Sequence, residues 1–293
     1  MNRWVIIAAV VGGTLVLCCG GTLVLGLVAD DGGGGDFAGA RSVPSGCSDA
    51  IDGWHQSIAE GGLVLTREGV TAELPWPFPI TDALRSGDSE LNILNAVIGA
   101  RYEPGQLQRG QYGELWLSGP VTERAGGKTV YVAFTSGAQS GIANPVVVFA
   151  PDAATIGRYS SFSALSAIYD LNRFSLSCAE LEGHWKSGFS TAAERYAIGT
   201  GQYLGAEAVA AWRDLQLGSG SYERESSAYV NRMFSKRKDS GSWSHDEWSL
   251  RLEPEGDEAI AYNAALIAVQ NGFLLRLQNQ KFTSDIEEFR KVE

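Results

Sequence analysis

The longest uninterrupted apolar stretch of the chain runs from Trp4 to Val28 and contains no Asp, Glu, Lys or Arg. A helix of that length would span the ~30 Å hydrocarbon core of a bilayer. A cleaved signal peptide has a shorter apolar core and a small-residue cleavage site. A lipoprotein would need a small residue before Cys18, where the chain has Leu17. The pattern therefore predicts an uncleaved anchor over residues 1–28, with cleavage or lipid attachment as the alternatives.

The flanks of this stretch predict its orientation. Arg3 precedes the apolar residues, and Asp30 and Asp31 follow them. The positive-inside rule then places the amino terminus in the cytoplasm and the rest of the chain outside a single-pass cell-membrane protein. Small residues near one face of the predicted helix would allow a homodimer through it, although they are also common in lone spans. They are Ala9, Gly13 and Gly20.

Residues 29–46 are rich in glycine and predict a flexible linker, so the folded domain is expected over residues 47–293. Within it, apolar residues at helical spacing or helix-capping residues predict six helices. The first, capped by Ser48, carries Ile51, Trp54, His55 and Ile58 and ends at Gly61-Gly62. The others are Asp88 to Gly99, Phe162–Asp170, Leu204–Leu215, Tyr222–Lys238 and a short terminal helix from Ser284.

Alternating or continuous apolar runs predict strands between these helices. They are a hairpin over Leu63–Leu74 that turns at Glu68-Gly69, and strands at Glu114–Ser118, Lys128–Thr135, Val146–Ala150, Arg173–Glu180 and Trp248–Leu252. The segment Asp257–Leu277 fits a helix or a hairpin, and Asn271-Gly272, a strong two-residue turn signal, favours the hairpin. Strands with interspersed helices and no regular βαβ alternation predict an α+β domain with a mainly antiparallel sheet packed with several helices.

The charge balance narrows the range of partners. The chain has a net charge of −11 at pH 7. So acidic a surface argues against nucleic acid and against an electrostatic grip on anionic polymers. An envelope ligand, a protein partner and the membrane itself remain as expected partners.

Only two cysteines, Cys47 and Cys178, follow the linker. In an oxidising compartment two cysteines most simply form a disulfide. Such a bridge would close a loop of roughly 130 residues and stabilise the domain by about 4–5 kcal/mol. The alternative is two buried free thiols. Neither cysteine has a His or Cys partner at a metal-ligand spacing, so no metal site is expected.

None of the three histidines belongs to a recognisable catalytic or metal motif. His55 is expected to be a packed structural residue, and His184 lies in a polar segment. Of the three, His245 has the most suitable neighbours for chemistry, because hydroxyls, carboxylates and two indoles surround it in residues 242–248. Adjacent residues of one loop rarely form a catalytic triad, since catalytic partners come from different elements.

Two glycine-rich segments come near to catalytic or cofactor motifs without matching them. Residues 137–141 miss the Gly-x-Ser-x-Gly elbow by one place. Residues 199–205 have one residue too many for a dinucleotide fingerprint. No catalytic residue and no cofactor are therefore predicted.

Aromatic residues supply the candidate ligand-binding positions. Trp76 and Phe78 lie between three prolines in a stiff extended segment that could border a groove. Covering a sheet edge or the core is the commoner use of such residues. His245 and Trp248 complete the predicted ligand-binding set.

The C-terminal part of the chain resembles a known class of domain. Gly256-Asp-Glu-Ala-Ile-Ala-Tyr262 and Val269-Gln-Asn-Gly-Phe-Leu-Leu-Arg-Leu277 are similar to the end of extracytoplasmic sensor-type domains on actinobacterial lipoproteins and membrane-anchored kinases. The resemblance covers about 40 residues and implies an α+β domain for ligand sensing, with no catalytic residue to carry over. The chain departs from that class in having only two exported cysteines and no kinase domain.

Together these patterns predict a single-pass protein whose extracytoplasmic domain binds a lipid, a wall fragment or another protein and is not catalytic. An envelope hydrolase using acidic residues or a Ser/His pair is one alternative. A membrane scaffold subunit is the other.

Overall fold

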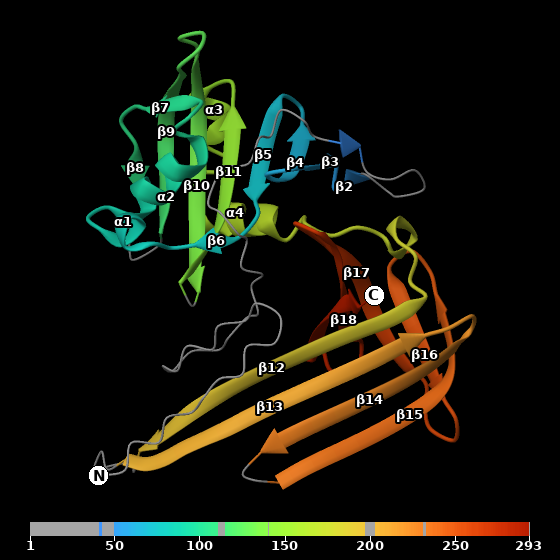
Figure 1. Ribbon diagram of the computed structural model, residues 1–293. Coiled ribbons are helices and arrows are strands. Elements are labelled where there is room, and N and C mark those ends of the chain that lie inside the picture. The colour runs from blue at the N-terminus through green and yellow to red at the C-terminus, as the bar shows by residue number, and fades with distance from the viewer. Residues whose placement is uncertain are drawn as a thin grey trace.

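The computed structural model describes residues 41–42, 50–110, 115–139, 141–196, 203–230 and 233–292. Within them the chain builds an eleven-stranded antiparallel sheet and a closed eight-stranded barrel (Figure 1). The predicted α+β class is therefore wrong, because strands dominate both parts. The described part contains no helix that is long and apolar enough to cross a membrane, and the predicted anchor and linker lie outside it.

The sheet has the strand order β1-β3-β4-β5-β11-β10-β9-β7, with β2, β6 and β8 attached at its sides. Its strands are β1 (Arg41–Ser42), β2 (Ala50–Ile51), β3 (Trp54–Ala59), β4 (Gly62–Arg67), β5 (Val70–Pro75), β6 (Phe78–Pro79), β7 (Tyr102–Pro104), β8 (Gln108–Arg109), β9 (Trp116–Glu123), β10 (Thr129–Gln139) and β11 (Ile142–Ala150). The helices are α1 (Asp82–Arg85), α2 (Ser89–Ile98), α3 (Ala153–Ile156) and α4 (Phe162–Tyr169).

The two faces of the sheet bury different side chains. Val146 and Val148 of β11 belong to one core cluster with Leu165 of α4. The intervening residue Val147 joins a second cluster with Leu94 of α2. Because successive strand residues point to opposite faces, a continuous apolar run such as β11 is what a strand covered on both sides requires.

The barrel is a simple meander in which each strand pairs antiparallel with the next and the last closes on the first. Its strands are β12 (Gly183–Tyr196), β13 (Tyr203–Leu217), β14 (Ser221–Val230), β15 (Met233–His245), β16 (Ser249–Pro254), β17 (Ile260–Val269), β18 (Gly272–Asn279) and β19 (Ile286–Val292). Figure 1 shows that β12 to β15 continue as long ribbons beyond the shorter strands.

A short segment between α4 and β12 joins the sheet to the barrel. Phe174 is fully buried and forms two backbone hydrogen bonds with Leu266 of β17, with N–O distances of 2.7 and 2.9 Å. The side-chain amide of Gln56 in β3 donates to the carbonyls of Leu171 and Arg173. One buried cluster therefore includes residues of the sheet and of the barrel.

Four of the six predicted helices are strands in the structure. The stretch after Ser48 is β2 and β3 where it is described, Leu204–Leu215 lies in β13, and Tyr222–Lys238 covers β14 and β15. In β14 Tyr222 is buried, whereas its neighbours Ser221 and Glu223 are exposed, because successive residues of a strand point to opposite faces. Pairing on both sides of a strand overrides the weak helix preference of alanine-rich segments.

The fourth is the predicted terminal helix from Ser284. Glu287, which was predicted to belong to its capping box, lies in β19 with its side chain buried. The predicted strand at Arg173–Glu180 is instead a single bridge at Phe174 followed by the 3-10 helix η2 (Leu176–Cys178).

The remaining local predictions are confirmed. The hairpin of β4 and β5 turns at Glu68 and Gly69, which both have positive φ. α2 has Asp88 as N-cap and Gly99 as C-cap, and α4 matches its predicted span. β16 contains Leu250 and Leu252, and β17 and β18 form the hairpin that Asn271-Gly272 favours.

Candidate functional site

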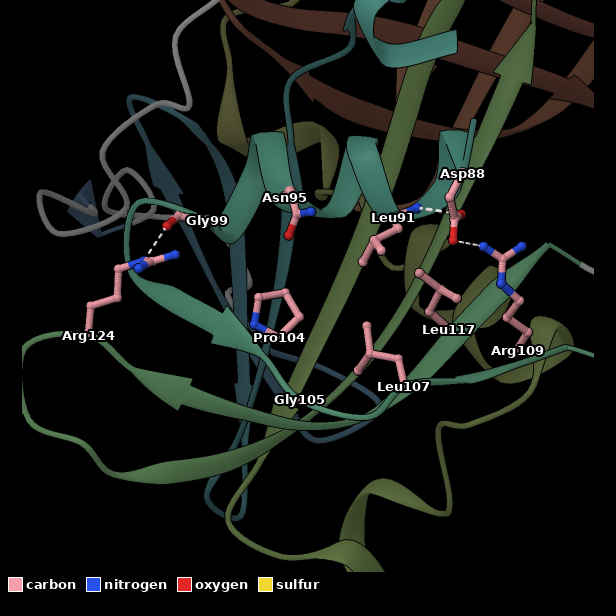
Figure 2. Close-up of a pocket in the computed structure, with 10 residues that line it drawn as sticks. All are labelled: Asp88, Leu91, Asn95, Gly99, Pro104, Gly105, Leu107, Arg109, Leu117 and Arg124. Carbon is pink, nitrogen blue, oxygen red and sulfur yellow. Dashed lines mark hydrogen bonds and ion pairs between the residues drawn. The ribbon is translucent and has the colours of Figure 1, made fainter. Parts of the chain in front are cut away.

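A cleft of about 460 Å³ lies between α2 and the edge of the sheet (Figure 2). Its apolar lining comes from Leu91 of α2, Pro104 of β7, Leu107, and Leu117 of β9. The exposed carboxamide of Asn95 lies at the middle of α2 on the same side. Asp88, Arg109 and Arg124 also line the cleft, so polar and apolar groups contribute about equally to its surface. Clefts of this volume that combine apolar walls with a few polar groups are the usual form of small-molecule sites.

The first end of the cleft is organised by the start of α2. Asp88 caps the helix, since its carboxylate accepts a hydrogen bond from the Leu91 backbone N–H at 3.2 Å. The same carboxylate forms an ion pair with Arg109 of β8, and Glu90 lies 3.6 Å from that guanidinium. The Asp88 carboxylate thus joins the start of α2 to β8 at the adjacent edge of the sheet.

The opposite end is organised by the end of α2. Arg124 donates from Nε to the Gly99 carbonyl at 2.7 Å, and its Nη1 lies 3.0 Å from Glu103 Oε1. Figure 2 shows Arg109 and Arg124 at the two ends of the cleft, each joined to a residue of α2 or its cap. Both cations have carboxylate neighbours, so the site offers little net charge to a ligand.

The structure does not bring the four predicted ligand-binding residues together. Trp76 donates its indole N–H to the Glu60 carbonyl at 2.7 Å and packs against the core cluster that the sheet shares with the barrel. Phe78, two residues later, packs against the other cluster, beneath α2. These two aromatic side chains cover the core. This is the commoner of the two roles that the sequence allowed, the other being the border of a ligand groove.

His245 and Trp248 lie at the turn between β15 and β16. The His245 ring stacks on Trp243 with 5.5 Å between ring centres, and Trp248 packs against the shared core cluster. Asp246 arranges the turn by accepting hydrogen bonds from the backbone N–H groups of Trp248 and Ser249. This turn is separate from the cleft beside α2, whose lining includes none of the four residues.

The other candidate residues have structural surroundings. His55 is an exposed residue of β3 rather than a packed one, and His184 of β12 lies 2.8 Å from an Asp214 carboxylate oxygen. Cys178 is buried in η2, whereas Cys47 lies outside the described residues, so the predicted bridge stays a prediction. Of the near-motifs, residues 137–139 belong to β10, and most of 199–205 lies outside the described part. Within the described ranges no group of three or more His, Cys, Asp and Glu residues could hold a metal ion.

A group of polar side chains inside the barrel was not predicted from the sequence. Arg224 of β14 donates from Nε to Asp239 of β15 at 3.0 Å and from Nη1 to the Tyr262 hydroxyl at 2.7 Å. The Tyr222 hydroxyl donates to the other Asp239 oxygen at 2.8 Å. Burial and this hydrogen bond raise the pKa of Tyr222.

An ion pair between β13 and β19, the two strands that flank β12, adjoins this group. Arg213 of β13 lies 3.1 Å from Glu287 of β19, whose side chain is only 8% exposed. Burial raises the pKa of Glu287 even though Arg213 and Arg224 lower it. We call Arg213, Tyr222, Arg224, Asp239, Tyr262 and Glu287 the polar cluster. The sequence carries no clear signal for it, because the apolar residues of β19, Ile286, Phe289 and Val292, are spaced by three and do not alternate.

The chain matches no protein-family model, no curated protein and no solved structure. The resemblance of the C-terminal segment to sensor-type domains stays a prediction.

Proposed function

We propose that the chain is a membrane-anchored extracytoplasmic binding module that holds a small, uncharged, partly apolar ligand in the cleft beside α2 and does not transform it. The cleft carries this proposal, because apolar side chains surround one exposed amide group and the charged side chains at its two ends already have partners. The predicted anchor at residues 4–28 supplies the location.

The charges of the cleft support an uncharged ligand. Arg109 already faces Asp88 and Glu90, and Arg124 already faces Glu103 and a carbonyl. A charged ligand would have to displace these partners. Leu91, Leu107 and Leu117 favour apolar groups, and the Asn95 amide can donate to or accept from one polar group.

Among the described residues that line the cleft there is no aromatic ring, so these residues offer no platform on which a sugar ring could stack. This favours a lipid-like or amide-containing molecule over a glycan. Binding would be driven mainly by the apolar area removed from water, and the single amide would set the orientation.

The experiment is a thermal-shift screen of the full chain in detergent against lipids, amide-containing wall fragments and glycans. A ligand that prefers the folded state raises the melting temperature, and the rise grows with the ratio of ligand concentration to dissociation constant. We expect a saturable rise with an uncharged amphiphile and none with glycans.

Two variants on the same helix connect any shift to the cleft. Asn95→Arg places a long charged side chain at the mouth of the cleft and should abolish the shift. Ala96→Arg is the matched control, because Ala96 is equally exposed on α2 but does not line the cleft. Equal loss of the shift in both variants, or its retention in Asn95→Arg, would exclude the cleft as the site.

A further inference from the structure

The groups that line the cleft follow a fixed order along α2. Asp88, Leu91, Asn95 and Gly99 are three or four residues apart, so they lie along one face of the helix and its caps. At a rise of about 1.5 Å per residue, Leu91 and Gly99 each lie about 6 Å along the axis from Asn95. The helix therefore presents an apolar side chain, then a carboxamide, then a residue without a side chain.

The opposite wall of the cleft follows the same order. Leu107 and Leu117 belong to the same hydrophobic cluster as Leu91, and Figure 2 shows all three toward the Asp88 end of the cleft. We call these three residues the leucine section. Next to it, Pro104 lies below α2 near the middle of the cleft. An aliphatic section thus adjoins a section whose polar group is the Asn95 carboxamide.

The Asn95 carboxamide can offer both of its hydrogen-bonding groups to a ligand. Its side chain is exposed, and within the described residues neither its N–H groups nor its oxygen bonds to another residue. Figure 2 shows it pointing into the cleft toward Pro104. A carboxamide donates and accepts at once, so a ligand that fits here carries an acceptor and a donor close together.

The protein itself shows how a carboxamide binds one residue of a peptide chain. At the joint of the sheet and the barrel, the Asn172 side chain accepts from the Ala268 N–H and donates to the Ala268 carbonyl, both at 3.0 Å. One carboxamide thus pairs with the N–H and the carbonyl of a single residue. Asn95 offers the same two groups, whereas an ester in place of the ligand N–H would leave the Asn95 oxygen without a donor.

The two ends of the cleft differ in the ligand groups that suit them. Arg109 faces two carboxylates, because both Asp88 and Glu90 lie near its guanidinium. Arg124 faces one, Glu103, which is 67% exposed, and such a surface pair is weak. In the described residues Arg124 donates from Nε and Nη1, so Nη2 can donate to a ligand. A ligand acceptor therefore fits the Arg124 end better than the Asp88 end.

We propose that the ligand of the cleft is an uncharged N-acylated peptide, held in one direction. Its acyl chain lies in the leucine section, the N–H and carbonyl of its first residue pair with Asn95, and its next carbonyl accepts from Arg124. This inference rests on the proposed function, because it takes the cleft to be the binding site. It narrows the uncharged, partly apolar ligand to a class in which an apolar chain, an amide residue and an acceptor follow in that order.

Three probes test this order by isothermal titration calorimetry on the full chain in lipid nanodiscs. The reference probe is N-hexanoylglycylglycinamide. Replacing the N–H of its first glycine by an ester oxygen removes one hydrogen bond to Asn95 and should weaken binding about fivefold. Replacing its hexanoyl group by acetyl leaves the leucine section unfilled and should weaken binding about tenfold or more.

Variants assign each preference to one residue. Asn95→Leu should bind the amide and the ester equally, because it removes the carboxamide and keeps the size of the side chain. Arg124→Met should bind the reference probe about fivefold more weakly, because a ligand carbonyl loses its donor. Arg109→Met is the matched control at the opposite end and should bind the reference probe as the natural chain does.

The outcomes separate this inference from the proposed function. Equal affinity of the natural chain for the amide and the ester would overturn the inference, as would an effect of Arg109→Met in place of Arg124→Met. Absence of binding by the reference probe also overturns it. If another uncharged amphiphile then still raises the melting temperature, and Asn95→Arg abolishes that rise, the proposed function stands alone. If no compound binds in the cleft, both are wrong.

Discussion

The barrel interior has an apolar part and a polar part that stabilise the molecule in different ways. The apolar part contains Trp185, Leu215, Leu266, Leu275 and Phe289, all essentially inaccessible to solvent, and it is continuous with the core of the sheet. The polar cluster occupies neighbouring interior positions. Buried apolar surface contributes stability roughly in proportion to its area. Buried ion pairs lose hydration, and their mutual attraction offsets that loss of free energy only where the geometry is good.

Each part has a different role. The apolar part holds the barrel in place against the sheet, and the polar cluster holds the strands of the barrel together. The apolar part joins the two modules through Phe174 and Leu266. The polar cluster links β13, β14 and β15 to β17 and β19 across the barrel. Substitutions in the apolar part should lower the stability of the whole molecule. The effect of a substitution in the polar cluster should depend on which charged partner is left unpaired.

The largest effect is expected from Phe174→Ala. This change removes a fully buried ring that also meets Phe273 edge to face at 5.4 Å, and it should lower the free energy of unfolding by about 3–5 kcal/mol. Denaturant unfolding of the full chain in detergent measures it. Phe162→Ala, at a ring that is 42% exposed on α4, is the control and should have a much smaller effect.

Arg224→Met should destabilise the polar cluster by about 3 kcal/mol, because it leaves the buried Asp239 carboxylate without its cation. Adding Asp239→Leu should recover much of the loss, since both charges are then gone. The exposed pair of Arg251 and Glu253 provides the comparison, and Arg251→Met should change stability by less than about 1 kcal/mol. If the single and double variants are equally unstable, the ion pair is not the cause.

A pH dependence should distinguish the polar cluster from the apolar part. Because burial raises the pKa of Glu287, the folded state binds its proton more tightly than the unfolded state. Its contribution is therefore fully present at low pH and is lost as the pH rises through the raised pKa. Relative to Glu287→Gln, the natural protein should become progressively less stable over that range.

Unfolding measured at a series of pH values tests this sign. Glu288→Gln, at the adjacent and more exposed carboxylate, shows whether any change in slope belongs to the buried residue. A slope that is identical in the natural protein and in Glu287→Gln would contradict the assignment.

The smallest effect is expected at the surface of the sheet. Asp88→Ala removes the cap of α2 together with the partner of Arg109, and should reduce stability by about 1 kcal/mol. Asp88→Asn keeps a capping oxygen and should lose less than half of that. Equal losses would mean that the ion pair, rather than the cap, is the important contact.

Local signals in the sequence predicted the sheet better than the barrel. The turn at Glu68-Gly69, the cap at Asp88 and the apolar run of β11 act over a few residues, so their structures follow from nearby chemistry. In contrast, β13 and β14 take their structure from partners that only the closed barrel supplies. Their alanine and serine positions match a helical spacing as well as a strand.

The candidate site was not predictable for a related reason. The cleft is lined by residues from α2, β7 and β9, which become neighbours only in the folded sheet. The prolines around Trp76 correctly predicted an extended segment, but the direction of the Phe78 side chain depends on the pairing of β6 with β11, and Trp76 is held by a backbone hydrogen bond to Gly61. The buried charges of the polar cluster resemble ordinary surface charges in the sequence.

The seam of the barrel has a consequence for the order of folding. Seven of its eight strand pairings join strands that are consecutive in the chain. The eighth, which we call the seam, joins the first strand β12 to the last strand β19 through three residue pairs. Local hairpins form early and distant contacts late, because loop closure must precede them. Amide protons of β19 that pair with β12 should therefore exchange with solvent sooner than those between β17 and β18, and the barrel should open at this seam first.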